Sequence, residues 1–168
     1  MKGAHWLAIA VAGMVASGCD GDSLRTLSQS DVVGIPPGDA TGSLFSGQYM
    51  STAIWKGACR CRVGSCSEIT VSLEPMTFPV VQTDGQLEFI DEADPASSAL
   101  CSIDGDGSFV CGSDQTTAVI VSYVLTTGRI AVANGRPVAM NLIAENTVLF
   151  PGYDCDFQVG LQASYVGP

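Results

Sequence analysis

The residues with the most obvious chemical potential are three closely spaced cysteines, Cys59, Cys61 and Cys66. Thiolates at such short range could bind a structural zinc ion or form a redox-active pair. Both readings are disfavoured, because the paired Cys-x2-Cys spacing of zinc sites is absent and the N-terminus predicts an oxidising compartment. We therefore expect these cysteines to form structural disulfides and expect no bound metal.

Acid–base and nucleophilic catalysis find little support. The only histidine, His5, lies in an N-terminal segment that we expect to be removed, which would exclude Ser-His-Asp, Cys-His and histidine–metal chemistry. A Ser–Lys dyad would have to use Lys56, and nothing around it resembles such a motif. Glu68, Glu74 and Glu88 alternate outward on expected strands, as a solvated face does, whereas a glycosidase needs two opposed acids. We expect no catalytic residue, no cofactor and no enzyme.

A calcium loop is the remaining metal hypothesis. Asp104, Asp106 and Ser108 place oxygen atoms at alternate positions, as the first half of an EF-hand does. Gln115 stands where the EF-hand requires a glutamate, and no helical pattern flanks the segment. A hairpin turn is the simpler interpretation.

The N-terminus has the organisation of a secretory signal. Lys2 is followed by an apolar run over residues 3–15 and by three small residues, Ala16, Ser17 and Gly18. A short basic region, an apolar segment and small residues before a cleavage site define such signals. The run is too short for a membrane-spanning helix, which needs about 20 apolar residues.

Ala16-Ser17-Gly18-Cys19 resembles the lipobox of bacterial lipoproteins, with Ala16 in place of the usual leucine. The resemblance implies that residues 1–18 are a signal peptide and that Cys19 receives a diacylglyceryl thioether and an acylated amino group. More than one acyl chain gives stable membrane anchoring. Asp20 would imply inner-membrane retention in enteric bacteria, although other lineages follow different rules. The resemblance covers only residues 1–19; beyond it, the chain is similar in style to small disulfide-bearing lipoproteins of Gram-negative envelopes.

Removal of residues 1–18 would leave six basic and 17 acidic residues, a net charge of −11. Such a surface repels nucleic acid, whose binding depends on Lys and Arg, and it would also repel anionic lipid headgroups. The expected contact with the membrane is therefore the anchor at Cys19. Residues 19–46 are rich in Gly, Ser, Asp and Pro and predict a flexible linker.

From residue 47 onward the pattern has the period of two that is typical of β-strands. The clearest case is residues 155–165, where apolar or aromatic side chains alternate with polar ones or glycine. Asp84-Gly85 predicts a two-residue hairpin turn, and further reversals are expected at residues 104–107, 127–128, 134–135 and 151–152. Residues 91–99 could form at most one helical turn. The fold class is therefore all-β: an antiparallel meander of about eight to ten strands over residues 47–168, closed as a barrel or packed as a sandwich and stapled by disulfides.

Six cysteines follow Cys19, an even number that fits three disulfides among 15 possible connectivities. They are Cys59, Cys61, Cys66, Cys101, Cys111 and Cys155. A three-residue turn after Asp104 would place Cys101 opposite Cys111. Cys61 and Cys66 flank a short segment and form the second expected pair. Cys59 and Cys155 would then join the first and last strands.

Two functions remain. The first is a non-enzymatic, lipid-anchored envelope lipoprotein with a structural or protein-binding role. The alternative is a small β-barrel that binds an apolar ligand in its interior. An apolar interior cavity of about 300 Å³ or more would favour the alternative, and a filled interior would exclude it. Arg60 and Arg62 are the one cationic pair in the acidic domain; they could receive an acidic partner or form local salt bridges.

Overall fold

The computed structural model describes residues 24–70, 74–90 and 99–168. Cys19 and the lipobox lie outside the described residues, as do residues 91–98 of the segment for which at most one helical turn was expected. Of the strand expected between Glu68 and Glu74, residues 71–73 lie outside them, and Glu68 belongs to a 3-10 helix. The elements, in chain order, are α1 (Gln29–Val32), β1 (Gly47–Val63), the 3-10 helix η2 (Cys66–Glu68), β2 (Thr77–Thr83), β3 (Gln86–Phe89), β4 (Ala99–Ile103), β5 (Ser108–Asp114), β6 (Val121–Ala133), β7 (Arg136–Phe150) and β8 (Tyr153–Gly167).

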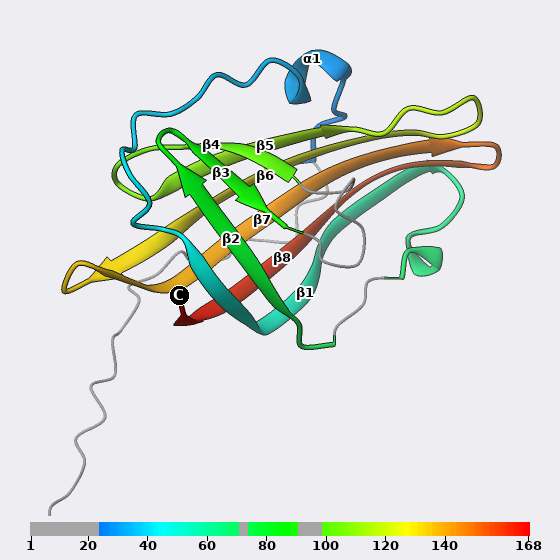
Figure 1. Cartoon of the computed structure of the whole chain (residues 1–168). Coiled ribbons are helices and arrows are strands. Elements are labelled where there is room, and N and C mark those ends of the chain that lie inside the picture. The colour runs from blue at the N-terminus through cyan, green and yellow to red at the C-terminus, as the bar shows by residue number, and fades with distance from the viewer. Residues whose placement is uncertain (1–23, 71–73, 91–98) are drawn as a thin grey trace, which may run out of the picture.

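The eight strands form one closed antiparallel barrel in which each strand pairs with the next and β8 pairs with β1 (Figure 1). This confirms the all-β prediction and selects the barrel over the sandwich. Over Gln48–Met50, β1 pairs with both β2 and β8, and beyond Met50 its strand partner is β8 alone. Strands β1, β6, β7 and β8 have 13 to 17 residues, whereas β2 to β5 have four to seven. One wall of the barrel is therefore much longer than the other.

Several of the turns follow from the sequence. Asp84 adopts a positive φ of 50° between β2 and β3, and Asn134 and Gly135 have φ values of 53° and 72° between β6 and β7, as a type I′ turn requires. The reversal predicted at Thr127-Gly128 is wrong, because both residues lie within β6. A Cβ at Gly128 would lie 2.4 Å from the Phe109 ring, so this glycine allows close packing inside the barrel.

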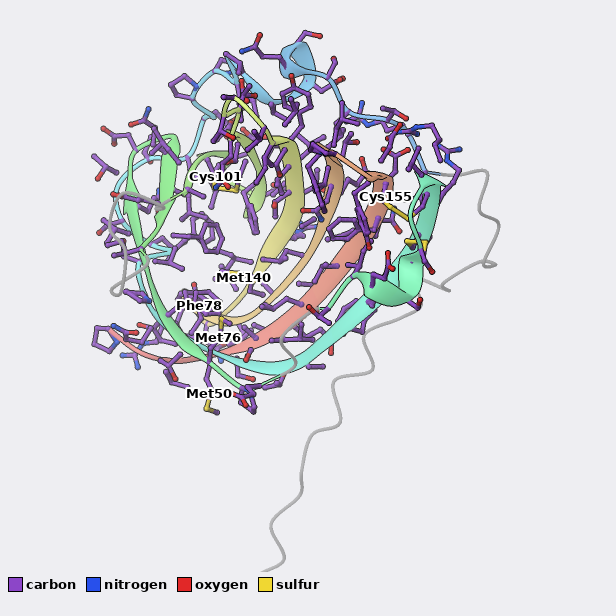
Figure 2. All side chains as sticks on the ribbon, turned by 90° about the vertical axis from the view of Figure 1, so that its right-hand side faces the viewer. Met50, Met76, Phe78, Cys101, Met140 and Cys155 are labelled. Atoms are coloured by element: carbon purple, nitrogen blue, oxygen red, sulfur yellow. A yellow bond between two sulfur atoms is a disulfide. The ribbon has the colours of Figure 1, made fainter. Side chains whose placement is uncertain are left out.

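Apolar side chains fill one end of the barrel. Tyr49, Leu87, Ile103, Ile130 and Met140 are completely buried there. Figure 2 views the barrel along its axis, and the labelled side chains of residues 78 and 140 point into the ring of strands while that of residue 50 points outward. We call this the plugged end; the opposite end, where β1 ends and β8 begins, is the cysteine rim.

Residues 24–46 do not form the predicted flexible linker. They cross the outside of β5 to β8 as an N-terminal strap (Figure 1) and then close the plugged end. Val32 packs with Leu27 on Leu125 of β6, and Phe45 joins the core at 2% exposure. Composition misled the prediction here, because a few well-spaced apolar residues anchor an otherwise linker-like segment.

The three disulfides use all six of the downstream cysteines. Cys101–Cys111 is confirmed, with the two residues directly opposed between β4 and β5. The other two expected pairs are wrong: Cys59 bonds Cys66, and Cys61 bonds Cys155. Irregular pairing between Lys56 and Cys59 of β1 sets a register in which Cys61 faces Cys155.

Candidate functional site

An apolar cavity of about 160 Å³ lies inside the barrel, between the core and the cysteine rim. Its wall comes from the inner faces of five consecutive strands, β3 to β7: Phe89, Ala99, Cys111, Thr126 and Leu142. Thr126 supplies the one hydroxyl, and the buried Cys101–Cys111 disulfide supports the wall from β4 and β5. The volume is about half of the 300 Å³ above which an interior ligand was expected, so the cavity does not meet that expectation. It suits a molecule of about one aromatic ring, since a cavity of about 150 Å³ holds benzene.

The second candidate site is a group of polar residues outside the barrel wall, where the strap meets β1, β7 and β8. Asp156 of β8 is completely buried, and its carboxylate accepts hydrogen bonds from Arg62 Nη1 at 2.6 Å, Arg60 Nη2 at 3.1 Å, Thr26 Oγ1 at 2.9 Å and Thr147 Oγ1 at 2.8 Å. We call these five residues the Asp156 cluster. Of the two hypotheses for Arg60 and Arg62, the structure supports local salt bridges.

Burial opposes ionisation of the Asp156 carboxyl, but the hydrogen bonds from Arg62, Thr147, Arg60 and Thr26 outweigh it. The pKa of Asp156 is accordingly lowered from its usual value. The ionised carboxylate thus holds the first residues of the strap on the barrel, which is a structural role.

A third feature is an uncharged area on the outer wall. The register places Trp55 of β1 beside Gly160 of β8, and Gly160 beside Ile143 of β7. From this row to the row of Met50, Ser164 and Ala139, toward the plugged end, the outward positions on the three strands are uncharged. We call this set of nine the uncharged face: Met50, Ala53, Trp55, Ala139, Asn141, Ile143, Gly160, Gln162 and Ser164.

Trp55 lies at one corner of the uncharged face, in the row nearest the cysteine rim, and its ring covers Gly160 of β8. A Cβ built on Gly160 would lie 2.2 Å from the indole ring, so the ring rests directly on the backbone of β8. Trp55 remains 40% exposed and Ile143 45% exposed. On a strongly acidic chain, an uncharged area with exposed large apolar side chains is unusual, and such areas mark sites of interaction.

The candidate residues named from the sequence have structural contacts of their own. Glu68 caps η2 by accepting a hydrogen bond from the Ser65 amide at 3.2 Å. Lys56 donates to the carbonyls of Cys66 and Ile69. Glu88 lies on the outer face of β3, next to the inward-facing Leu87.

The Asp104–Ser108 segment is the β4–β5 hairpin turn. Asp106 accepts from the Ser108 amide at 2.8 Å and forms a salt bridge with Arg129 at 3.3 Å. Asp104 accepts from the strap amide of Asp39 at 3.2 Å. Both carboxylates therefore shape the turn and its contact with the strap.

Within the described residues, Cys59, Cys61 and Cys66 are the one group of three or more potential metal ligands whose ligand atoms converge. Because all three form disulfides, they offer no thiolate to a metal in this state. In the same described ranges, no helix is both long and apolar enough to cross a membrane.

The Asp156 cluster and the uncharged face were not predicted from the sequence. Asp156 occupies an outward position in the alternating pattern of β8 and resembles its solvated neighbour Gln158. The available signal lay in the strap, where Leu24, Leu27 and Phe45 are large apolar residues in a segment of linker-like composition.

Comparison with known proteins gives no family for this chain. No protein-family model matches it, and no curated protein matches it. One solved structure with some similarity is a multidomain protein including DUF1735 from Bacteroides ovatus, with 8% sequence identity and a TM-score of 0.32. The alignment covers 71% of this chain and 48% of the other, so the chain spans about half the length of that protein. A similarity at this level carries no argument about fold or function.

Proposed function

We propose that this protein is a non-enzymatic lipoprotein of a bacterial cell envelope, anchored through Cys19, and that it binds a protein partner through the uncharged face. The anchor is supported by the lipobox resemblance of residues 16–19. Leu24, where the strap is already buried, follows Cys19 by five residues. A chain of that length reaches at most about 18 Å, which keeps the barrel close to the bilayer.

The anchor is tested by replacing Cys19 with alanine. The expected result is transfer of the protein from the membrane fraction to the soluble fraction, together with loss of labelled palmitate incorporation. Continued membrane association of the variant would contradict the anchor.

The observation that carries the binding role is Trp55, which is 40% exposed within the uncharged face with its ring over Gly160. Aromatic residues are enriched where protein interfaces are fully buried, and charged residues are depleted there. The face spans only three strands about 4.8 Å apart. Its area is therefore smaller than the roughly 800 Å² that each partner buries in a stable complex in solution. The partner that fits is therefore a second envelope-anchored protein, because confinement to one membrane raises the effective concentration and makes a small interface sufficient.

Site-specific photocrosslinking in intact cells tests this role. A photoreactive amino acid at Ile143, on the uncharged face, is expected to yield a discrete crosslinked product that disappears when Trp55 is replaced by alanine. The matched control places it at Val81 of β2, which is similarly exposed at 41%. Identical products from both positions, or none from Ile143, would refute the proposed interface.

A second candidate function rests on the cavity, whose 160 Å³ falls short of the roughly 300 Å³ expected for a larger ligand: the barrel holds a small apolar molecule of about one ring. Four of the five wall residues are only half-buried, so the cavity communicates with solvent. Toluene is a suitable probe, and its binding can be followed through chemical shifts of the methyl groups of Leu142.

Ala99 and its neighbour Leu100 provide a matched test of the cavity. Ala99→Leu adds a branched side chain to the cavity wall and should abolish toluene binding. Leu100→Ala changes an outward side chain that is 56% exposed and should leave binding unchanged. Equal binding by the two variants, or no binding by the parent, would exclude an interior site.

A further inference from the structure

Four sulfur atoms meet at the cysteine rim, in two disulfides that touch. Cys59 and Cys61 come from β1, Cys66 begins η2 and Cys155 lies near the start of β8. The bonds join Cys59 to Cys66 and Cys61 to Cys155. The Sγ atoms of Cys61 and Cys66, which are not bonded to each other, lie only 3.6 Å apart. One sulfur of each bridge is therefore in van der Waals contact with the other bridge.

This contact does not depend on the Cys59–Cys66 bond. Lys56 donates hydrogen bonds to the carbonyls of Cys66 and Ile69, and the Tyr153 hydroxyl donates to the Ser65 carbonyl at 2.8 Å. The Ser65 hydroxyl accepts from the Ser67 amide at 3.3 Å and caps η2. These hydrogen bonds would keep Cys66 beside β1 after its disulfide opened.

Solvent reaches the Cys59–Cys66 bridge more easily than the other two bridges. Cys59, Cys61 and Cys66 are each half-buried, whereas Cys155 is completely buried. Cys101 and Cys111 are buried in the core at 3% and 5% exposure. An external thiol can therefore reach the Cys59–Cys66 bridge more readily than the bridge in the core.

We propose that the cysteine rim is a site of thiol–disulfide exchange with an external dithiol, in which Cys66 changes its partner from Cys59 to Cys61. In the first step a thiolate of the dithiol attacks Cys59 Sγ, and Cys66 leaves as a thiolate. The second thiol of the dithiol then releases Cys59 as a thiol, and the dithiol becomes a disulfide. Two electrons have passed to the protein.

Once the external dithiol has reduced the Cys59–Cys66 bond, the second step is an exchange within the protein and needs no further reductant. The Cys66 thiolate attacks Cys61 Sγ, a Cys61–Cys66 bond forms, the Cys61–Cys155 bond breaks, and Cys155 leaves as a thiolate that takes up a proton. Such reactions depend on access of the attacking thiolate to the disulfide sulfur, and the 3.6 Å contact supplies that access. The product keeps one bridge at the rim, within the β1–η2 segment, and the covalent link between β1 and β8 is gone.

Trypsin separates the participating cysteines, because Arg60 lies between Cys59 and Cys61 and Arg62 lies between Cys61 and Cys66. The oxidised full-length protein is treated with limiting dithiothreitol, quenched with N-ethylmaleimide in acid and digested without reduction. The peptides to be followed by mass spectrometry are 57–60, 61–62, 63–129 and 130–168.

Before reduction, peptide 57–60 should be joined to 63–129, and 61–62 to 130–168. After partial reduction, the expected new species joins 61–62 to 63–129, with maleimide on both Cys59 and Cys155. Maleimide on Cys59 and Cys66 alone, with 61–62 still joined to 130–168, would overturn the proposal.

Two serine variants give an independent test that needs no reductant. Cys59→Ser leaves Cys66 as a free thiol, and the Cys61–Cys66 linkage should then account for roughly a tenth or more of the molecules. Cys66→Ser removes the attacking sulfur and should retain Cys61–Cys155 throughout. Circular dichroism checks that both variants keep their strand content. If either variant does not fold, the partial reduction of the unsubstituted protein remains the test. Exclusive Cys61–Cys155 linkage in a folded Cys59→Ser protein would refute the exchange.

Discussion

Arg62 donates a hydrogen bond from Nη1 to Asp156 Oδ2 at 2.6 Å, and the Asp156 side chain has no exposure to solvent. The same carboxylate accepts from Thr147, whose hydroxyl in turn accepts from the backbone amide of Leu27 at 2.8 Å. Arg60 bridges Asp156 and the carbonyl of Leu24. One acidic side chain of β8 thus organises the attachment of the strap to the barrel.

Replacing Asp156 with asparagine should lower the free energy of unfolding by about 3 kcal/mol, at the lower end of the range for breaking a buried ion pair. The effect is limited because the Arg60 and Arg62 side chains remain 41% and 39% exposed. Urea denaturation measures the change. Asp154→Asn removes a partly exposed partner of Arg62 and should cost at most about 1 kcal/mol. Equal losses in the two variants would contradict a special role for Asp156.

Acid should release the strap. The pKa of Asp156 is lower in the folded protein than in the unfolded chain, where it is about 3.9. Its stabilising contribution is therefore fully present above about pH 4 and is lost as the pH falls through the folded-state pKa. Hydrogen-exchange protection of the Leu27 amide should fall over this acid range, relative to the Ile103 amide that bonds the Gly85 carbonyl.

Asp156→Asn supplies the control for the acid experiment, because asparagine does not titrate in this range. Its Leu27 protection should already be low at neutral pH and should change little on acidification. A parent protein whose Leu27 protection is constant down to pH 2 would show that another group holds the strap.

The barrel could be predicted from the sequence because its determinants are local. Alternation along residues 155–165 and turn pairs such as Asn134-Gly135 each specify one strand or one reversal. Cys101 and Cys111 pair across a single hairpin, so counting residues through its turn was sufficient.

The cysteine rim could not be predicted in the same way. Register shifts in β1 between Lys56 and Cys59, and between Cys61 and Val63, decide which cysteine faces β8. Irregularities of this kind have no local signature in the sequence. Of the two wrongly expected pairs, Cys61 and Cys66 nevertheless have their Sγ atoms 3.6 Å apart.

The strap and the Asp156 cluster depend on contacts between residues far apart in the sequence. Thr26 lies 130 residues from Asp156, and Phe45 lies 37 residues from Gln82, whose side chain accepts its amide hydrogen bond at 2.9 Å. Composition describes neither relationship. The burial of Phe45 becomes predictable only when the barrel has an end for it to fill.

Phe45→Ala should destabilise the protein by about 3–5 kcal/mol, the usual effect of deleting a buried phenylalanine. Its ring is 2% exposed, and its carbonyl accepts a hydrogen bond from the Tyr49 hydroxyl at 2.9 Å. The adjacent Leu44 is 43% exposed, and Leu44→Ala should change the free energy of unfolding by about 0.5 kcal/mol or less. Thermal and urea unfolding measure both. A small effect at Phe45 would mean that the strap does not contribute to the core.

Gly112→Ala tests the contact between the strap and β5 from the barrel side. A Cβ at Gly112 would lie 1.9 Å from the Val32 carbonyl oxygen, so the strap backbone would have to move away from β5. Overpacking of this kind costs about 1–3 kcal/mol. Because displacement frees the strap, trypsin should also cleave after Arg25 several-fold faster than in the parent. At Gly105 the nearest atom to an added Cβ is Asp39 Oδ1 at 3.6 Å, so Gly105→Ala should leave both stability and cleavage near parental values. If the two alanine variants behave alike, the strap does not lie against β5 in solution.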